Sequence, residues 1–103
     1  MAPLYITEYN KLGNTDRFDQ TVMAPYAIPV TTQTVAISGA SARSAPFNAS
    51  TRFVFITTDT TCSIAFTADN TSVATDANER LVQDAGRFYA VNPSGTVSVI
   101  SNS

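Results

Sequence analysis

The sequence predicts an all-β protein, an antiparallel β-sandwich of jelly-roll or immunoglobulin-like type with an extended N-terminal strand and arm. Three observations predict it. Apolar and polar residues alternate with a period of two in several segments, as in strands with one face in a core and one in water. Threonine, a β-branched residue that suits the solvent face of a pleated sheet, occupies 15 of 103 positions. Turn-forming residues separate the segments at short intervals.

The expected strands are short. The first covers residues 4–9 and alternates Leu4 and Ile6 with Tyr5 and Tyr9. The others contain Val35 with Ile37, Phe53 to Ile56, Cys62 with Ile64 and Phe66, Arg87 to Val91, and Val97 with Val99. Because Phe53 to Ile56 is apolar on both faces, it should be a central strand that is covered on both sides.

Turn signals connect these strands. They are Leu12-Gly13-Asn14, Ser38-Gly39-Ala40, Thr58-Asp59-Thr60, Asp84-Ala85-Gly86 and Asn92-Pro93-Ser94-Gly95. The turn at 58–60 separates two strand patterns so closely that it predicts a β-hairpin. Residues 77–82 could form one helical turn, but no helical periodicity continues it.

The stretch from Gln20 to Gln33 follows no period. Residues 23–30 are mostly apolar, and Pro25 and Pro29 have no backbone N–H to donate to a sheet. Two interpretations remain open: a loop that lies over the edge of the sandwich, or an extended arm that reaches a neighbouring subunit. A proline-containing arm loses little conformational entropy when it docks. We therefore divide a single domain into a strand and arm, residues 1–33, and a sandwich core, residues 34–103.

Size and composition favour assembly over independent stability. A domain of 103 residues buries roughly 60–70% of its unfolded surface, which gives a small margin of stability. Cys62 has no cysteine partner within the chain, and the residues for a structural zinc site are missing. Association with other chains is the remaining common source of stability, so we expect a homo-oligomer (a dimer or trimer) or attachment to a larger assembly.

Charge excludes several classes of partner. The net charge is −2 and the six basic residues are scattered, which argues against nucleic-acid binding. No apolar run is long enough to span a membrane, and the N-terminus has no signal-peptide pattern. The sequence therefore predicts a protein made in the cytoplasm and kept there unless it leaves as part of a particle.

The sequence does not predict an enzyme. It contains no histidine, and Cys62 is expected to be a small buried apolar residue rather than a nucleophile. Asp69, Asp76 and Glu79 share one loop, but they lack the spacing of a calcium-binding loop and are expected to be solvated. Neither a cofactor nor a metal is expected. The Asp84 and Arg87 pair is interpreted as an ion link at the surface or at a subunit interface.

Tyrosines gather near the N-terminus, and tyrosine is enriched at protein interfaces. Tyr5 and Tyr9 are predicted to lie at an interface, whereas Tyr89 could belong to the core. The full set of predicted interface residues is Leu4, Tyr5, Tyr9, Met23, Pro25, Tyr26, Ile28 and Pro29.

Three segments carry a resemblance to known proteins. The opening MAPLYITEY, the stretch from QTVAI through PFN, TRFV and CSIAF, and the end RFYAV to VSVI resemble a group of small structural proteins of tailed bacteriophages. The resemblance spans nearly the whole chain and carries no catalytic motif or residue-level contact. It implies a β-sandwich of the virion, a capsid decoration (cement) protein on the head surface, with the major capsid protein as partner. A module of the tail or fibre that recognises the host, through polar loops such as 69–84, is the alternative.

Overall fold

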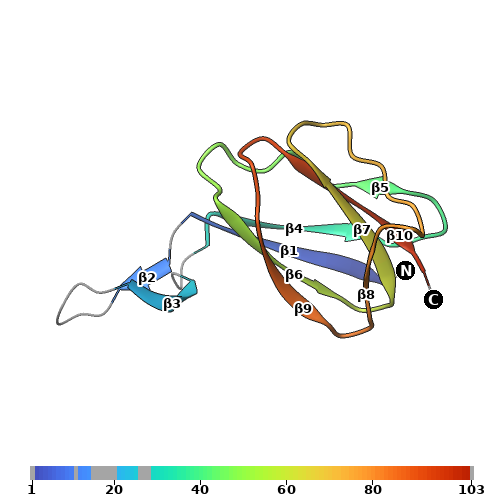
Figure 1. Ribbon diagram of the computed structural model, residues 1–103, viewed down its shortest axis with the longest axis horizontal. Coiled ribbons are helices and arrows are strands. Elements are labelled where there is room, and N and C mark those ends of the chain that lie inside the picture. The colour runs from blue at the N-terminus through green and yellow to red at the C-terminus, as the bar shows by residue number, and fades with distance from the viewer. Residues whose placement is uncertain (1, 11, 15–20, 26–28, 103) are drawn as a thin grey trace.

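The computed structural model describes residues 2–10, 12–14, 21–25 and 29–102. These residues form an all-β structure without helix (Figure 1). The strands are β1 (Pro3–Tyr9), β2 (Leu12–Asn14), β3 (Thr21–Pro25), β4 (Thr31–Ala36), β5 (Ala42–Arg43), β6 (Phe53–Thr58), β7 (Cys62–Thr67), β8 (Glu79–Leu81), β9 (Gly86–Ala90) and β10 (Thr96–Ser101). The described part of the chain accordingly offers no long apolar helix of the kind that crosses a membrane.

Eight of these strands form two antiparallel sheets. The first sheet has the order β4-β1-β6-β9 and the second sheet has the order β5-β10-β7-β8. Pairing in the first sheet places Ile6 opposite Gln33 on one side and Ile56 on the other. In the second sheet Val97 pairs with Phe66, and Val99 pairs with Ile64.

One hydrophobic core joins the two sheets. The residues of the first sheet in it are Leu4, Ile6, Val35, Val54 and Ile56, and those of the second are Cys62, Ile64, Leu81, Val97 and Val99. They recur at every second position of their strands, so the predicted period-two alternation of the strands is confirmed. β6 lies inside its sheet, as expected. Its outer residues Phe53 and Phe55 are only half-buried, so the prediction that both faces are covered is met on the core side alone.

The connection between β6 and β7 corrects the sequence prediction. A hairpin was expected there, but the two strands belong to different sheets. Val54 and Ile56 reach the shared core from one side, and Cys62 and Ile64 reach it from the other. The chain must therefore cross between the sheets at residues 59–61. Thr58 closes this crossing, since its hydroxyl donates to the carbonyl oxygen of Thr60 over 2.5 Å.

The N-terminal region also differs from its expected form. β1 lies between β4 and β6 as an interior strand, and residue 33 falls inside β4. Leu12–Asn14 is a strand rather than a turn, and it pairs with β3. Residues 79–81 form strand β8, although the sequence also allows a helical turn over residues 77–82.

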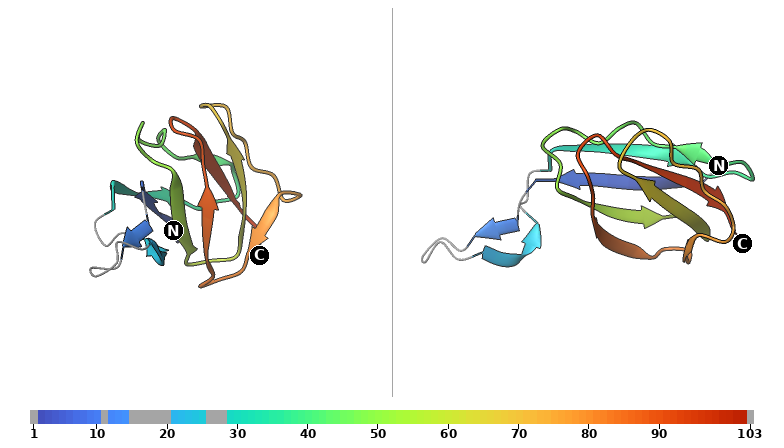
Figure 2. Two further views of the ribbon diagram at one scale, coloured as in Figure 1. Left: turned by 60° about the vertical axis from the view of Figure 1, so that its left-hand side comes forward. Right: turned by 45° about the horizontal axis from the view of Figure 1, so that its top comes forward.

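The β2–β3 hairpin stands away from the two larger sheets. Figures 1 and 2 show it beyond one end of the body, along the longest dimension of a molecule that measures 49 × 27 × 21 Å. Among the strands that the structure describes, β2 and β3 pair only with each other. The hairpin is an insertion between β1 and β4, which are neighbours: the N–H of Val30 donates to the carbonyl oxygen of Glu8 over 2.7 Å.

Hydroxyl groups fasten the loop after β7 onto the outer face of the second sheet. The Ser72 hydroxyl lies 2.9 Å from that of Thr96 and 2.7 Å from that of Ser98, and all three residues are buried. Arg43 donates to the carbonyl oxygen of Ser72 over 2.9 Å. Serine and threonine were expected on the solvent face, so their burial here is a correction. The hydroxyls satisfy one another where the loop covers the sheet.

Candidate interaction surface

Aromatic side chains gather on the outer face of the first sheet. We call Tyr5, Tyr9, Phe53, Phe55 and Phe88 the aromatic face. The rings of Tyr9 and Phe53 stack with centroids 5.4 Å apart, and those of Phe55 and Phe88 are tilted at 4.5 Å. Tyr5 is 42% exposed and Phe88 is 54% exposed. Large apolar groups left in water on one face are typical of interaction sites.

Strand register explains why these rings meet. Tyr9 is the direct cross-strand neighbour of Phe53, and Phe55 is that of Phe88. Directly opposite residues on one face of an antiparallel pair have neighbouring Cβ atoms, and aromatic pairs there stabilise a sheet. Gly86 makes room for the cluster, because a Cβ atom at this position would lie 2.6 Å from the Phe55 ring.

The outward side of the first sheet is uncharged. By alternation and register, the residues that share it are Pro3, Tyr5, Thr7, Tyr9, Thr32, Thr34, Ala36, Phe53, Phe55, Thr57, Gly86, Phe88 and Ala90. A carboxylate stands at its rim, where the Tyr5 hydroxyl donates to Oδ2 of Asp59 over 3.2 Å. That hydrogen bond, and the negative charge of Asp59, raise the pKa of Tyr5.

The predicted interface residues do not form one cluster. Tyr5 and Tyr9 lie on the aromatic face. Pro29, which follows β3 and precedes β4 in the sequence, is half-buried. Leu4 corrects the prediction: it is fully buried at 0% exposure, because it points into the core from the opposite side of β1. Met23 and Pro25 belong to β3 in the hairpin. Tyr26 and Ile28 lie outside the described residues.

Phe53, Phe55 and Phe88 were missed as candidate surface residues. The apolar run that contains the first two was interpreted as a doubly covered strand. Their period-two spacing was a signal that they share a face, but their approach to Tyr9 and Phe88 depends on which strands pair. Sequence alone does not give that pairing.

A second aromatic group links β9 of the first sheet to β7 and β8 of the second sheet. Tyr89 in β9 packs against Phe66 in β7, with ring centroids 4.9 Å apart. The Tyr89 hydroxyl donates to Oε2 of Glu79 in β8. Burial and this hydrogen bond raise the pKa of Tyr89. Glu79 also forms a salt bridge with Arg87, whose Nη1 lies 4.0 Å from Oε2 of Glu79. Arg87 therefore pairs with Glu79 rather than with Asp84, the partner expected from the sequence.

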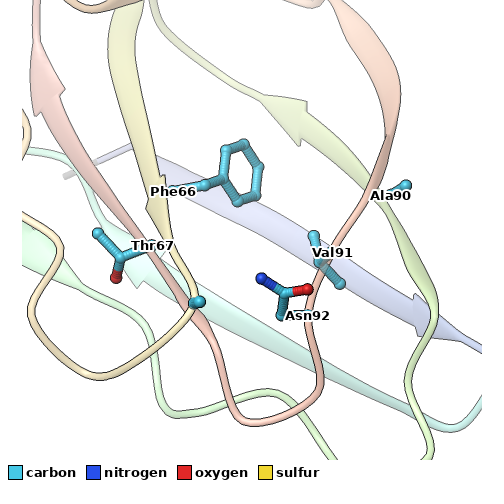
Figure 3. A pocket seen from close by; sticks show the side chains of 6 residues that line it. Phe66, Thr67, Ala90, Val91 and Asn92 are labelled. Carbon is cyan, nitrogen blue, oxygen red and sulfur yellow. The ribbon is translucent and has the colours of Figure 1, made fainter.

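A hollow of about 280 Å³ lies beside this group, between the end of β7 and the chain that leaves β9. Figure 3 shows the Phe66 ring and the Asn92 amide between these segments. Its lining residues are Phe66, Thr67, Ala68, Ala90, Val91 and Asn92. They offer apolar contacts and neutral hydrogen-bonding groups to a ligand, and none of them is an acid or a base at neutral pH.

The residues considered for catalysis or metal binding are dispersed. Cys62 is buried in the core as predicted, and burial raises the pKa of its thiol. Asp69 accepts hydrogen bonds from Thr71, which lower the pKa of its carboxyl group. Within the described residues no three of the side chains that commonly hold metals come together.

Glu8 is a buried acid that the sequence patterns did not single out. It is 1% exposed on the inner side of β1. Its Oε1 accepts hydrogen bonds from the Thr51 hydroxyl (2.7 Å) and the Asn48 N–H (2.9 Å), and its Oε2 accepts one from Gln33 (3.2 Å). The carboxyl group thereby fastens residues 48–51 to β1 and β4. Its hydrogen-bonding capacity serves the fold.

No protein-family model, curated protein or solved structure matches this chain.

Proposed function

We propose that this chain is a structural protein of a bacteriophage virion, a β-sandwich that decorates the outer head surface and bridges neighbouring capsid subunits. Its chemistry is contact between surfaces, and it catalyses no reaction. The resemblance of the two ends and the middle of the chain to small phage structural proteins supports this proposal, as does the architecture of a β-rich body with one projecting element.

The observation that carries the proposal is the β2–β3 hairpin. It is inserted between two neighbouring strands of the first sheet and extends away from the body. A two-stranded hairpin has marginal stability on its own, so a projecting one gains from docking. Its outer edges also present backbone donors and acceptors for pairing with another sheet. On this proposal the two large sheets lie on the capsid surface, and the hairpin region contacts the major capsid protein. The contacting residues are Met23, Pro25, Tyr26, Ile28 and Pro29.

Each copy need bind only weakly. A small interface of roughly 1,000 Å² suffices for a specific contact, and many copies on one shell act together. The added contacts between capsid subunits would oppose the pressure of packaged DNA. Copies that reach the head surface become virion components after synthesis in the host cytoplasm.

Replacement of the hairpin tests the proposal. Removal of residues 1–30 would also remove β1, an interior strand, and would destroy the fold. The Val30 N–H is hydrogen-bonded to the Glu8 carbonyl oxygen, so the chain on either side of the insertion is already close together. Residues 11–28 can therefore be replaced by Gly-Ser-Gly, which would leave β1 and β4 as an ordinary hairpin. We expect this variant to keep its cooperative unfolding and to lose at least 100-fold in affinity for phage heads stripped of the chain. Val73→Lys, at an exposed loop residue, is the matched control and should bind normally.

Unchanged binding of the folded replacement variant would contradict the proposal. Cryo-electron microscopy of labelled virions separates it from the alternative. Copies that follow the capsid lattice support a decoration protein, whereas a small ring of copies at the tail would establish the tail or fibre alternative.

A further inference from the structure

The aromatic face is an unpaired surface of a β-sheet. In the described part of the chain the loop after β7 covers the outer side of the second sheet, with Ser72 hydrogen-bonded to Ser98. The outer side of the first sheet instead presents its aromatic rings. Tyr5 and Phe88 together leave about 200 Å² of aromatic surface in water, from side chains of roughly 150–250 Å² each. The half-buried Tyr9, Phe53 and Phe55 extend this surface across three neighbouring strands.

The size of the face matches a small dimer interface. Four strands spaced about 4.8 Å apart, with about six residues each at roughly 3.4 Å per residue, give a flat projection of about 400 Å². Side-chain relief makes the accessible area larger than this projection. Specific interfaces begin near 500 Å² per partner. Burial of the whole outer side is therefore enough for a dimer at the small end of the range.

Charge favours a second copy as the occupant. Each molecule has a net charge of only −2, so the long-range repulsion between two copies is weak and screened by salt. The outward residues of the first sheet are all uncharged, from Thr34 on β4 to Phe88 on β9. Two such faces come together without burying an unpaired charge.

We propose that two copies of this chain pack their first sheets face to face through the aromatic face and form an isologous dimer. Two sheets in this arrangement lie about 10 Å apart with their strands within about 30° of alignment. A two-fold axis that runs across the strands places aromatic rings against aromatic rings and threonines against threonines. The two β2–β3 hairpins then emerge at opposite ends of the dimer.

Sedimentation velocity of the full chain tests this inference. We expect the wild-type protein to sediment at about twice its monomer mass of 11.0 kDa at micromolar concentration. Phe88→Lys should raise the dimer dissociation constant at least 30-fold, because it replaces the most exposed ring of the aromatic face by a charge that the dimer would bury. Thr34→Lys is the second variant. Thr34 is exposed on the edge strand β4, opposite Tyr5 and outside the packed ring pairs of Tyr9, Phe53, Phe55 and Phe88. Its replacement should therefore spare the monomer but bury a lysine in the dimer.

Val82→Lys is the matched control, because it replaces another exposed apolar residue outside the first sheet. It should leave the dissociation constant within about threefold. A wild-type chain that stays monomeric at 100 µM would overturn the proposal, and so would a dimer that Thr34→Lys and Phe88→Lys leave intact. A loss of the dimer in Val82→Lys equal to that in Phe88→Lys would also overturn it.

The dimer and particle binding are separate properties of the chain. Replacement of residues 11–28 leaves the aromatic face in place, so that variant should remain dimeric even if it no longer binds phage heads. Failure of the virion proposal therefore leaves this inference standing, and the reverse holds as well.

Discussion

At Gly95 the fold has no room for a side chain. A Cβ atom there would lie 2.6 Å from the carbonyl oxygen of Thr67 and 3.0 Å from that of Asn92, and both are backbone atoms that cannot rotate away. At Gly39 the same atom would meet nothing within 4 Å. Neither glycine has a positive φ, so the two positions differ in space rather than in backbone conformation.

Gly95→Ala should therefore lower the free energy of unfolding by about 1–3 kcal/mol through steric strain. Gly39→Ala should leave it unchanged or raise it by up to about 1 kcal/mol, because alanine restricts the unfolded chain. Urea unfolding of the two variants measures both effects. Equal stability of the two variants would contradict the close approach of Thr67 to Gly95.

Tyr89 makes the free energy of unfolding depend on pH in the alkaline range. Its pKa in the folded protein is raised above the ordinary value of about 10, because burial and the bond to Glu79 both favour the neutral phenol. Above about pH 10 the unfolded chain loses this proton while the folded chain keeps it. The contribution of Tyr89 to the free energy of unfolding is therefore complete below that pH, and it is lost as the pH rises toward the pKa of Tyr89 in the folded protein.

Unfolding at pH 9 to 11.5 measures this contribution. For the wild type we expect the free energy of unfolding to fall with a slope of up to about 1.4 kcal/mol per pH unit from this residue. Tyr89→Phe should remove that part of the slope. Tyr5→Phe is the comparison: the bond to Asp59 also raises the pKa of Tyr5, but at an exposed position, so this variant should remove a smaller part of the slope than Tyr89→Phe does. A slope that is the same in Tyr89→Phe and the wild type would refute the assignment.

At the scale of elements, Glu8 holds β1, β4 and residues 48–51 together. Glu8→Ala would leave the Thr51 hydroxyl and the Asn48 N–H without their buried acceptor. Each unsatisfied donor costs about 1–3 kcal/mol. We expect Glu8→Ala to lower the free energy of unfolding by about 2–4 kcal/mol in urea.

Glu8→Gln is the matched variant for testing the hydrogen bonds of Glu8. Its carbonyl oxygen still accepts from Thr51 and Asn48, but its NH₂ group faces the NH₂ group of Gln33. Gln33 cannot turn its amide without cost, because its Oε1 accepts the Ala45 N–H. A loss of about 1 kcal/mol is expected. If alanine and glutamine at this position were equally destabilising, the hydrogen bonds to Oε1 would not be the cause.

Strands β2 and β3 show which features of the fold the sequence patterns do not predict. Proline and apolar content in residues 20–33 suggested an arm or a loop, and the structure pairs Thr21–Pro25 with Leu12–Asn14 as a projecting hairpin. The Leu12-Gly13-Asn14 segment predicts a turn, because glycine and asparagine favour turns. Pairing with β3 overrides that local preference. Strand propensity depends strongly on the neighbour that a strand acquires.

At the scale of the whole molecule, the two faces of the first sheet differ in burial and in the residues that they pack against. The inner residues of β6, Val54 and Ile56, are completely buried and close the core. The outer residues Phe53 and Phe55 assemble a surface with Tyr9 and Phe88. The hairpin projects from the end of the same sheet (Figure 2). Core, aromatic face and hairpin thus occupy separate regions, so the variants proposed for each can be tested independently.

The sequence by itself determined that the chain is all-β, where most strands lie and which residues alternate into the core. Those properties are local, because a period of two and β-branched side chains act within a few residues. Tertiary structure alone decided that β6 and β7 belong to different sheets, that Glu8 and Ser72 are buried, and that Tyr9 meets Phe53 while Phe55 meets Phe88. These features depend on pairing between distant segments, which is set by the packing of the whole core.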